Sequence, residues 1–216
     1  MISGTGPRVG KTMVGCALAF AFKVRSMRVG VMKPVQTGCP DRDGVLMPED
    51  AAALLAGASS NLPLELACLY RYRAPLAPAA AAEVDAMPLP VVHAIERAYR
   101  EILASSDVML VEDADGLAAP IDWSHTYADL ARALGLEIIL VAANRLGFIN
   151  AAAMTLDYAA RRTLPVRGFI LSALDREASA TVRRDAELLS RATGATCLGT
   201  VRFKEPLALD LVERLL

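Results

Sequence analysis

The stretch "GTGPRVGKT", residues 4–12, decides the fold that the rest of the sequence must fit. Its glycines let the backbone direct N–H groups at a phosphate, with a helix N-terminus behind them. The usual phosphate-binding loop has four residues before Gly-Lys-Thr, whereas Gly4 and Gly10 enclose five. Lys11 supplies a cation for the transferred phosphate, and the Thr12 hydroxyl supplies a ligand for magnesium. The sequence therefore predicts a nucleotide site on a longer loop.

Composition and charge exclude several classes of protein. The 216 residues carry 23 Lys and Arg against 24 Asp and Glu, so no overall field recruits nucleic acid or an acidic membrane surface. Apolar residues reach 54%, but no uninterrupted stretch is long enough to span a bilayer. The four cysteines form no Cys-x-x-Cys pair and suit a reduced cytoplasm. We expect one domain over residues 1–216.

The N-terminal region also has the outline of a secretory signal, because Arg8 and Lys11 precede the apolar run "MVGCALAFAF". A buried helix behind a phosphate loop would carry the same run. The helix interpretation is favoured, because it leaves Gly10, Lys11 and Thr12 at the helix start, where phosphate binding needs them.

Short apolar runs alternate with longer helical patterns along the chain. This alternation predicts a three-layer α/β fold of the P-loop NTPase type, a mostly parallel sheet with helices on both faces. The predicted strands are 28–35, 107–112, 137–143, 165–171 and 195–201. The predicted helices lie near 11–25, 49–57, 90–104, 124–134, 148–162, 177–193 and 207–215.

Two segments fit this pattern less directly. The Pro/Ala-rich segment 73–90 is expected to be an ordered surface segment rather than a hinge. Only residues 1–3 precede the loop, although a first strand of about five residues is typical, so we expect that the natural start lies upstream.

Further polar residues follow the predicted strands. "KPVQTG", residues 33–38, puts Lys33 and Thr37 at the carboxyl end of a parallel strand, where open α/β sheets bind ligands. Glu112 ends the buried strand "MLVE", and Asp50 lies in the first turn of a helix, where a plain helix-start carboxylate is the simpler interpretation. With the Thr12 hydroxyl, Asp50 and Glu112 would form a set of hard oxygen ligands for magnesium.

These motifs together resemble the dethiobiotin synthetase family over nearly the whole chain. The resemblance rests on the five-residue loop spacing, "KPVQTG", the helix-start Asp50, the strand-end Glu112 and "NRLGFIN" at 144–150, in this order. It implies an ATP-dependent cyclo-ligase of biotin biosynthesis that joins CO2 to 7,8-diaminononanoate. One amine becomes a carbamate, ATP converts the carbamate to a carbamic-phosphoric anhydride, and the second amine closes the ureido ring.

The resemblance also implies roles for individual residues. Lys11 and Lys33 would neutralise the γ-phosphate and the carbamate, Thr37 would bind the substrate, and magnesium would bridge the β- and γ-phosphates. "RLGFIN" implies a homodimer in which Gly147 and Asn150 receive the substrate carboxylate of the neighbouring subunit, although a plain helix cap is the alternative. The residues expected to bind ATP are Thr5, Gly6, Arg8, Val9, Gly10, Lys11, Thr12 and Ser172.

The sequence departs from the family at several positions. The family's "EGAGG" is "EDADG" here, so Asp113 and Asp115 replace glycines. At roughly 7 Å from a phosphate, each added charge would repel it by about 2 kcal/mol, unless the aspartates face solvent or hold another cation. Arg8 stands in a segment that is usually acidic and would partly offset them. Ser172 and Arg202 stand where an Asn and a Pro are usual, which leaves the base preference open.

Two other functions remain open from the sequence. One is a nucleotide-dependent switch ATPase of the deviant P-loop group, although that group usually has a lysine where Gly6 stands. The other is a diverged relative that binds nucleotide without ligating, prompted by Asp113 and Asp115.

Overall fold

The computed structural model describes residues 1–204 and 213, and a row of parallel strands forms its centre. β1 (Ile2–Gly4) pairs with β8 (Ile138–Ala143), and β8 pairs with β9 (Val166–Ser172), all in parallel. β9 pairs in parallel with β10 (Cys197–Val201), and β2 (Val29–Met32) pairs in parallel with β7 (Val108–Val111). A parallel bridge between Ile2 and Glu112 brings β7 beside β1. In spatial order the strands are β2, β7, β1, β8, β9 and β10. The predicted parallel α/β fold is confirmed.

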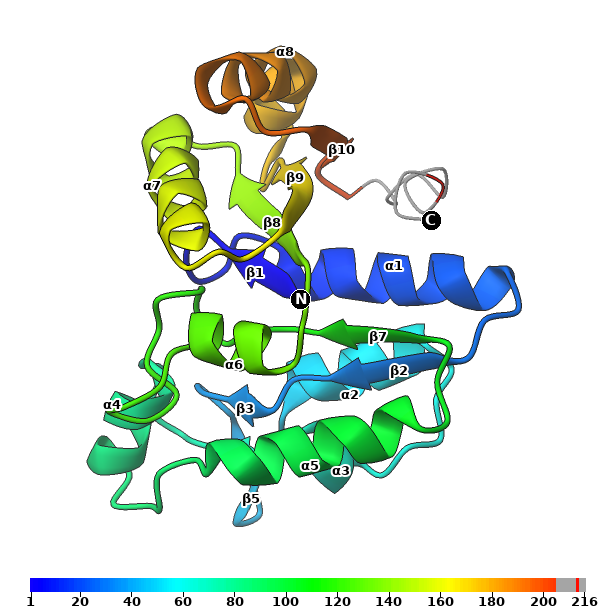
Figure 1. The fold of residues 1–216 in the computed structure, drawn as a ribbon, viewed down its shortest axis with the longest axis vertical. Helices are drawn as coiled ribbons and strands as arrows, with labels where there is room; N and C mark the ends of the chain where they lie inside the picture. Colours follow the sequence, from blue (N-terminus) through cyan, green and yellow to red (C-terminus); the bar gives the residue numbers. More distant parts are fainter. Residues whose placement is uncertain (205–212, 214–216) are drawn as a thin grey trace.

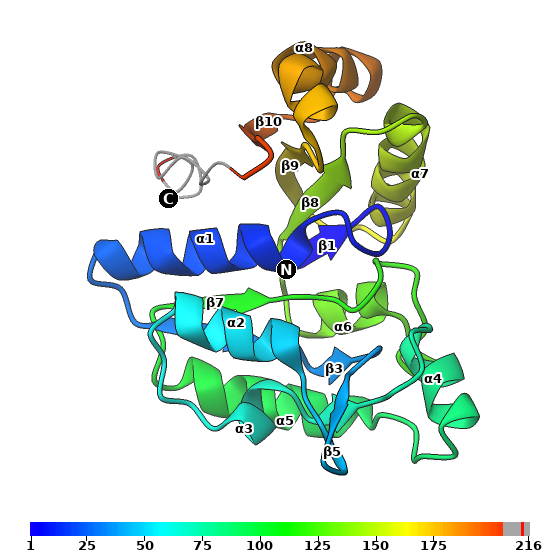
Figure 2. The ribbon, with the colours of Figure 1, turned by 180° about the vertical axis from the view of Figure 1, so that it is seen from behind.

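Helices cover both faces of this sheet (Figures 1 and 2). Alternate residues of the fully buried β8 face opposite layers, because Cβ atoms alternate along a strand: Val141 belongs to the apolar cluster of α1 and α2, whereas Leu140 packs with α7 and α8. The helices of one face are α1 (Lys11–Val24) and α2 (Glu49–Gly57). Those of the other are α5 (Val92–Leu103), α6 (Tyr127–Ala133), α7 (Phe148–Arg161) and α8 (Arg176–Thr193).

Two predicted segments differ from the structure. The strand expected over 28–35 is interrupted, because the chain turns away after Met32 and the Lys33 N–H donates to the Ala67 carbonyl instead. The segment 73–90 is not a plain surface segment, since it contains α4 (Pro78–Val84), whose alanines 79, 81 and 82 are fully buried. Alanine side chains are small enough to let this short helix pack closely.

Short elements complete the described chain, and the predicted helix 207–215 lies outside the described residues apart from position 213. Among the described residues, no helix combines the length and apolar character needed to cross a membrane. The short elements are β3 (Val35–Gln36), β4 (Asp41–Arg42), β5 (Val45–Leu46), α3 (Leu64–Ala67) and β6 (Tyr70–Arg71).

Gly168 provides a test of the packing between β9 and β10. Its φ is +153°, and a Cβ atom there would lie 2.4 Å from the Thr196 carbonyl oxygen. Gly168→Ala is therefore expected to lower the free energy of unfolding by about 3 kcal/mol, from backbone strain and overpacking together. Gly194→Ala is the matched control, because Gly194 also has positive φ but open space around it. Equal losses for both variants in urea unfolding would show that the contact with Thr196 is unimportant.

Candidate functional site

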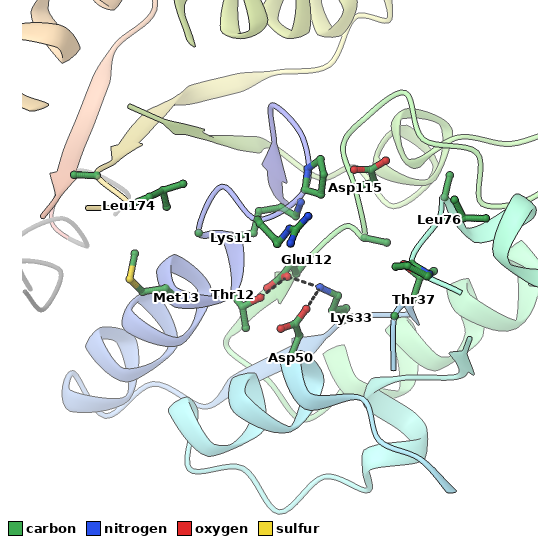
Figure 3. A pocket seen from close by; sticks show the side chains of 18 of the residues that line it. Lys11, Thr12, Met13, Lys33, Thr37, Asp50, Leu76, Glu112, Asp115 and Leu174 are labelled. Atoms are coloured by element: carbon green, nitrogen blue, oxygen red, sulfur yellow. Dashed lines mark hydrogen bonds and ion pairs between the residues drawn. The ribbon is translucent and has the colours of Figure 1, made fainter. Parts of the chain in front are cut away.

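A cleft of about 1020 Å³ lies at the carboxyl ends of the strands (Figure 3). Parallel sheets bind ligands at this edge because the loops that follow neighbouring strands meet there. The segments that line it are the phosphate loop with the start of α1, the start of α2, and the chain after β2, β6, β7, β9 and β10. The lining residues are Pro7, Arg8, Gly10–Met13, Lys33, Thr37, Gly38, Asp50, Pro75–Ala77, Glu112, Ala114, Asp115, Ala173, Leu174 and Arg202–Lys204.

Two residues of the phosphate loop, Val9 and Gly10, pack against the core and fix its conformation. Val9 is fully buried in the apolar cluster below α1, which anchors the middle of the longer loop. Gly10 precedes α1 with φ +99°, and a Cβ atom there would lie 2.9 Å from Ser172 Oγ. Glycine is therefore required at position 10 both for its backbone angles and for close packing against β9.

Lys33 joins two carboxylates from separate elements. Its Nζ donates to Asp50 Oδ2 and to Glu112 Oε1, each at 2.6 Å, and Thr12 Oγ1 donates to Glu112 Oε1 at 2.8 Å (Figure 3). Lys33 and Glu112 are buried, whereas the Asp50 side chain is 42% exposed. The three side chains expected from the sequence to bind magnesium, Thr12, Asp50 and Glu112, therefore lie together, and Lys33 lies among them.

The charges of this cluster depend on one another. Burial lowers the pKa of Lys33, but the charges of Glu112 and Asp50 outweigh burial and raise it above its usual value. Burial raises the pKa of Glu112, and the charge of Lys33 opposes that effect. The ammonium of Lys33 is therefore stabilised as a cation in the buried part of the cleft.

Lys11 has a separate partner, Asp113, which decides between the two alternatives that the sequence left open for this aspartate. Asp113 does not face solvent: its side chain is fully buried, and its Oδ1 lies 3.5 Å from Lys11 Nζ. Lys11 Nζ also donates to the Gly6 carbonyl oxygen at 3.1 Å. The cation that Asp113 holds is therefore the lysine of the loop itself.

The structure divides the other predicted site residues between several places. Arg8, Gly10, Lys11, Thr12, Lys33, Thr37, Asp50 and Glu112 line the cleft. Thr5 and Gly6 line a neighbouring pocket of about 510 Å³, bounded also by Asp115 and α7. Ser172 is buried behind Gly10 rather than in the cleft lining, and Gly147 and Asn150 lie outside both linings.

Sequence reasoning missed two parts of the site. Pro75, Leu76 and Ala77 line the cleft, although only the proline-rich composition marked this segment. The Gln36 side chain accepts a hydrogen bond from the Ala51 N–H at 3.2 Å and so fixes the start of α2, next to Asp50. No sequence pattern identifies that contact.

The donor atoms at this site fit a magnesium ion in part. Glu112 Oε2 is buried and has no hydrogen-bond partner among the described residues, and Thr12 Oγ1 and the Asp50 carboxylate lie close to Glu112. The described residues contain no group of three or more His, Cys, Asp or Glu placed to hold a metal. A magnesium ion here would therefore also need oxygens from phosphate and water, which is its usual preference.

The start of α7 is exposed. Gly147 has φ +88° at the helix N-cap, and Asn150 follows in the first turn. Leu146 is fully exposed, and Met154, one turn beyond Asn150, is 66% exposed. This surface borders the 510 Å³ pocket, whose lining includes Met154.

Comparisons with known proteins agree with this architecture. A family model described as an AAA domain matches residues 1–209. The chain is 36% identical over 208 residues to the ATP-dependent dethiobiotin synthetases BioD of Anaeromyxobacter dehalogenans strains 2CP-C and 2CP-1, covering 96% of this chain and 87% of each relative.

Solved structures show the same fold at low sequence identity. The MinD cell division protein of Aquifex aeolicus is 16% identical with a TM-score of 0.55, covering 99% of this chain and 84% of that one. A ParA family ATPase from Chlorobium tepidum TLS is 15% identical with a TM-score of 0.56, covering 99% and 86%.

The buried ion pair makes a prediction about stability. Lys33→Met leaves the carboxylate of Glu112 buried without its ammonium partner, so the free energy of unfolding should fall by about 3 kcal/mol. The double variant Lys33→Met/Glu112→Gln removes both charges and should recover most of that loss. Urea unfolding near pH 7 measures both. A double variant as unstable as the single one would contradict this account.

Proposed function

Because the chain belongs to the ATP-dependent dethiobiotin synthetase family and is an ATP-dependent ligase, we propose that the cleft forms the ureido ring of dethiobiotin. The substrates are 7,8-diaminononanoate, CO2 and ATP. An amine of the diamine adds to CO2 and loses a proton, which gives a carbamate. A carbamate oxygen then attacks the γ-phosphorus while the bond to ADP breaks. The second amine attacks the carbonyl carbon of the anhydride, and phosphate leaves as the ring closes.

The observation that carries this proposal is the meeting of two lysines with Thr12, Asp50 and Glu112 in one cleft. Such a cluster suits phosphoryl transfer, which depends mainly on positioning and charge compensation. Lys11 would neutralise the transferred phosphoryl group from the loop side, and Lys33 from the side of β2. Thr37, which lines the same cleft, would bind the substrate beside them.

Magnesium would be held by Thr12, Asp50 and Glu112. When bound, it neutralises the β- and γ-phosphates and keeps them in one orientation. Lys33 bridges Asp50 and Glu112. If the Lys33 side chain rotated toward the phosphates, both carboxylates would be free to bind the metal. The nucleotide would contact Thr5, Gly6, Arg8, Val9, Gly10, Lys11 and Thr12, with Ser172 near the base.

A homodimer belongs to the same proposal. The exposed Leu146 and Met154 flank the first turn of α7 beside the smaller pocket. Exposed apolar side chains of this kind support the proposal that a partner subunit covers this surface. The helix N-terminus with Gly147 and Asn150 would bind the substrate carboxylate of the partner subunit. A single domain over residues 1–216, in the cytoplasm, completes the proposal.

The test of this function measures two products at once. The purified protein receives diaminononanoate, bicarbonate, magnesium and each nucleoside triphosphate in turn, and dethiobiotin and phosphate are quantified together. We expect equal amounts of both products with ATP. Phosphate without dethiobiotin, independent of the diamine, would indicate a switch ATPase. Neither product would indicate a diverged relative that has lost ligation.

Lys11→Ala is expected to reduce dethiobiotin formation at least about 100-fold, because the terminal phosphates lose their cation inside the loop. Circular dichroism and urea unfolding establish that the variant is folded. Lys23→Ala, a lysine in the last turn of α1, is the matched control and should keep normal activity. Near-normal turnover by Lys11→Ala would exclude the role assigned to this lysine.

Subunit mixing tests the shared site. Lys11→Ala and Asn150→Ala homodimers are each expected to be inactive at substrate concentrations where the Asn150→Ala defect is strong. An equal mixture, exchanged to equilibrium, should regain about a quarter of wild-type activity, because half of the dimers are mixed and each has one intact site. No recovery, despite subunit exchange confirmed by differently tagged chains, would show that Asn150 serves its own subunit.

A further inference from the structure

The proposed reaction gives no task to Asp113, the residue that follows Glu112 at the end of β7. Its side chain is fully buried, and among the described residues neither carboxylate oxygen accepts a hydrogen bond. Its ion-pair partner is Lys11, at 3.5 Å. Burial raises the pKa of the Asp113 carboxyl, and the charge of Lys11 is the largest interaction that opposes this rise. The contact with the ammonium is therefore the main interaction that favours the ionised form of Asp113.

The position of Asp113 relative to the loop determines what it does to Lys11. Asp113 is absent from the lining of the cleft, whereas Lys11 is part of it. The carboxylate therefore lies behind the ammonium, on the side away from the nucleotide. With the Gly6 carbonyl oxygen 3.1 Å from Nζ, it holds the ammonium at the loop before any phosphate arrives.

The same contact weakens the attraction of Lys11 for phosphate. A negative charge directly behind a positive one turns a single charge into a dipole, whose field falls more steeply with distance. Both residues are buried, so solvent and salt screen this effect little. A triphosphate in the cleft therefore meets a lysine whose charge is already partly compensated from within the protein.

We infer that Asp113 is a positioning residue that restrains Lys11 and thereby lowers the affinity of the loop for nucleoside triphosphates. The inference rests on the proposed function only in that Lys11 contacts the terminal phosphates. A merely structural role predicts the opposite result, since removing a structural support would loosen the loop and weaken binding.

The test replaces Asp113 by its neutral isostere. Asp113→Asn should lower the dissociation constant of a non-hydrolysable ATP analogue with magnesium about threefold to tenfold, measured by calorimetry on the full chain. In steady state, KM for ATP should fall by a similar factor while kcat does not increase. Urea unfolding verifies that the variant is folded.

Asp107→Asn is the matched control for loss of one negative charge. Asp107 lies just before β7, at the opposite end of the strand, and pairs with Arg28 on the surface. Its effect on the dissociation constant should stay within about twofold, because solvent screens an exposed pair.

Two results would overturn the inference: weaker or unchanged binding of the analogue by Asp113→Asn, or an equal gain in affinity by Asp107→Asn. The calorimetric result does not depend on ligation. A wild-type protein that binds the analogue but makes no dethiobiotin would overturn the proposed function alone.

Discussion

The buried bridge from Lys33 to Glu112 and Asp50 is the constraint on which the site depends. Each of the three residues comes from a different part of the chain, and Nζ lies 2.6 Å from both carboxylates. Glu112 can remain buried because an ammonium accompanies it. The ends of β2 and β7 and the start of α2 are therefore fixed relative to one another, and Thr12 is tied to the same point through its hydrogen bond with Glu112.

The parallel sheet makes this convergence predictable from the sequence. Buried strands of a parallel sheet are apolar on both faces, so a charged residue at the end of such a run marks the edge where loops meet. Lys33 and Glu112 both follow such runs, and the structure brings them together. The loop spacing and the helix start after Gly10 likewise predict the position of Lys11, the other lysine of the cleft.

Other features depend on contacts that no local pattern records. The sequence leaves open whether Asp113 faces solvent or holds a cation, and only the approach of Lys11 from another element decides for the cation. Ser172 lies behind Gly10 because the side chain at this strand end packs under the loop, which periodicity alone does not determine. β3 and β6 are two residues long, too short for alternation to be recognised, and the alanines of α4 carry little hydropathic contrast.

The two lysines of the cleft share one electrostatic arrangement. Each ammonium has a buried carboxylate within 3.5 Å, Asp113 for Lys11 and Glu112 for Lys33. Buried cations can be kept ionised in this way, but their attraction for a free anion is reduced. A ligand that brings only negative charge therefore competes with the internal carboxylates for both lysines. A triphosphate that carries its own divalent ion avoids this competition at Lys33, since the ion compensates Asp50 and Glu112, the carboxylates that Lys33 releases. Asp113 does not line the cleft, so it stays paired with Lys11.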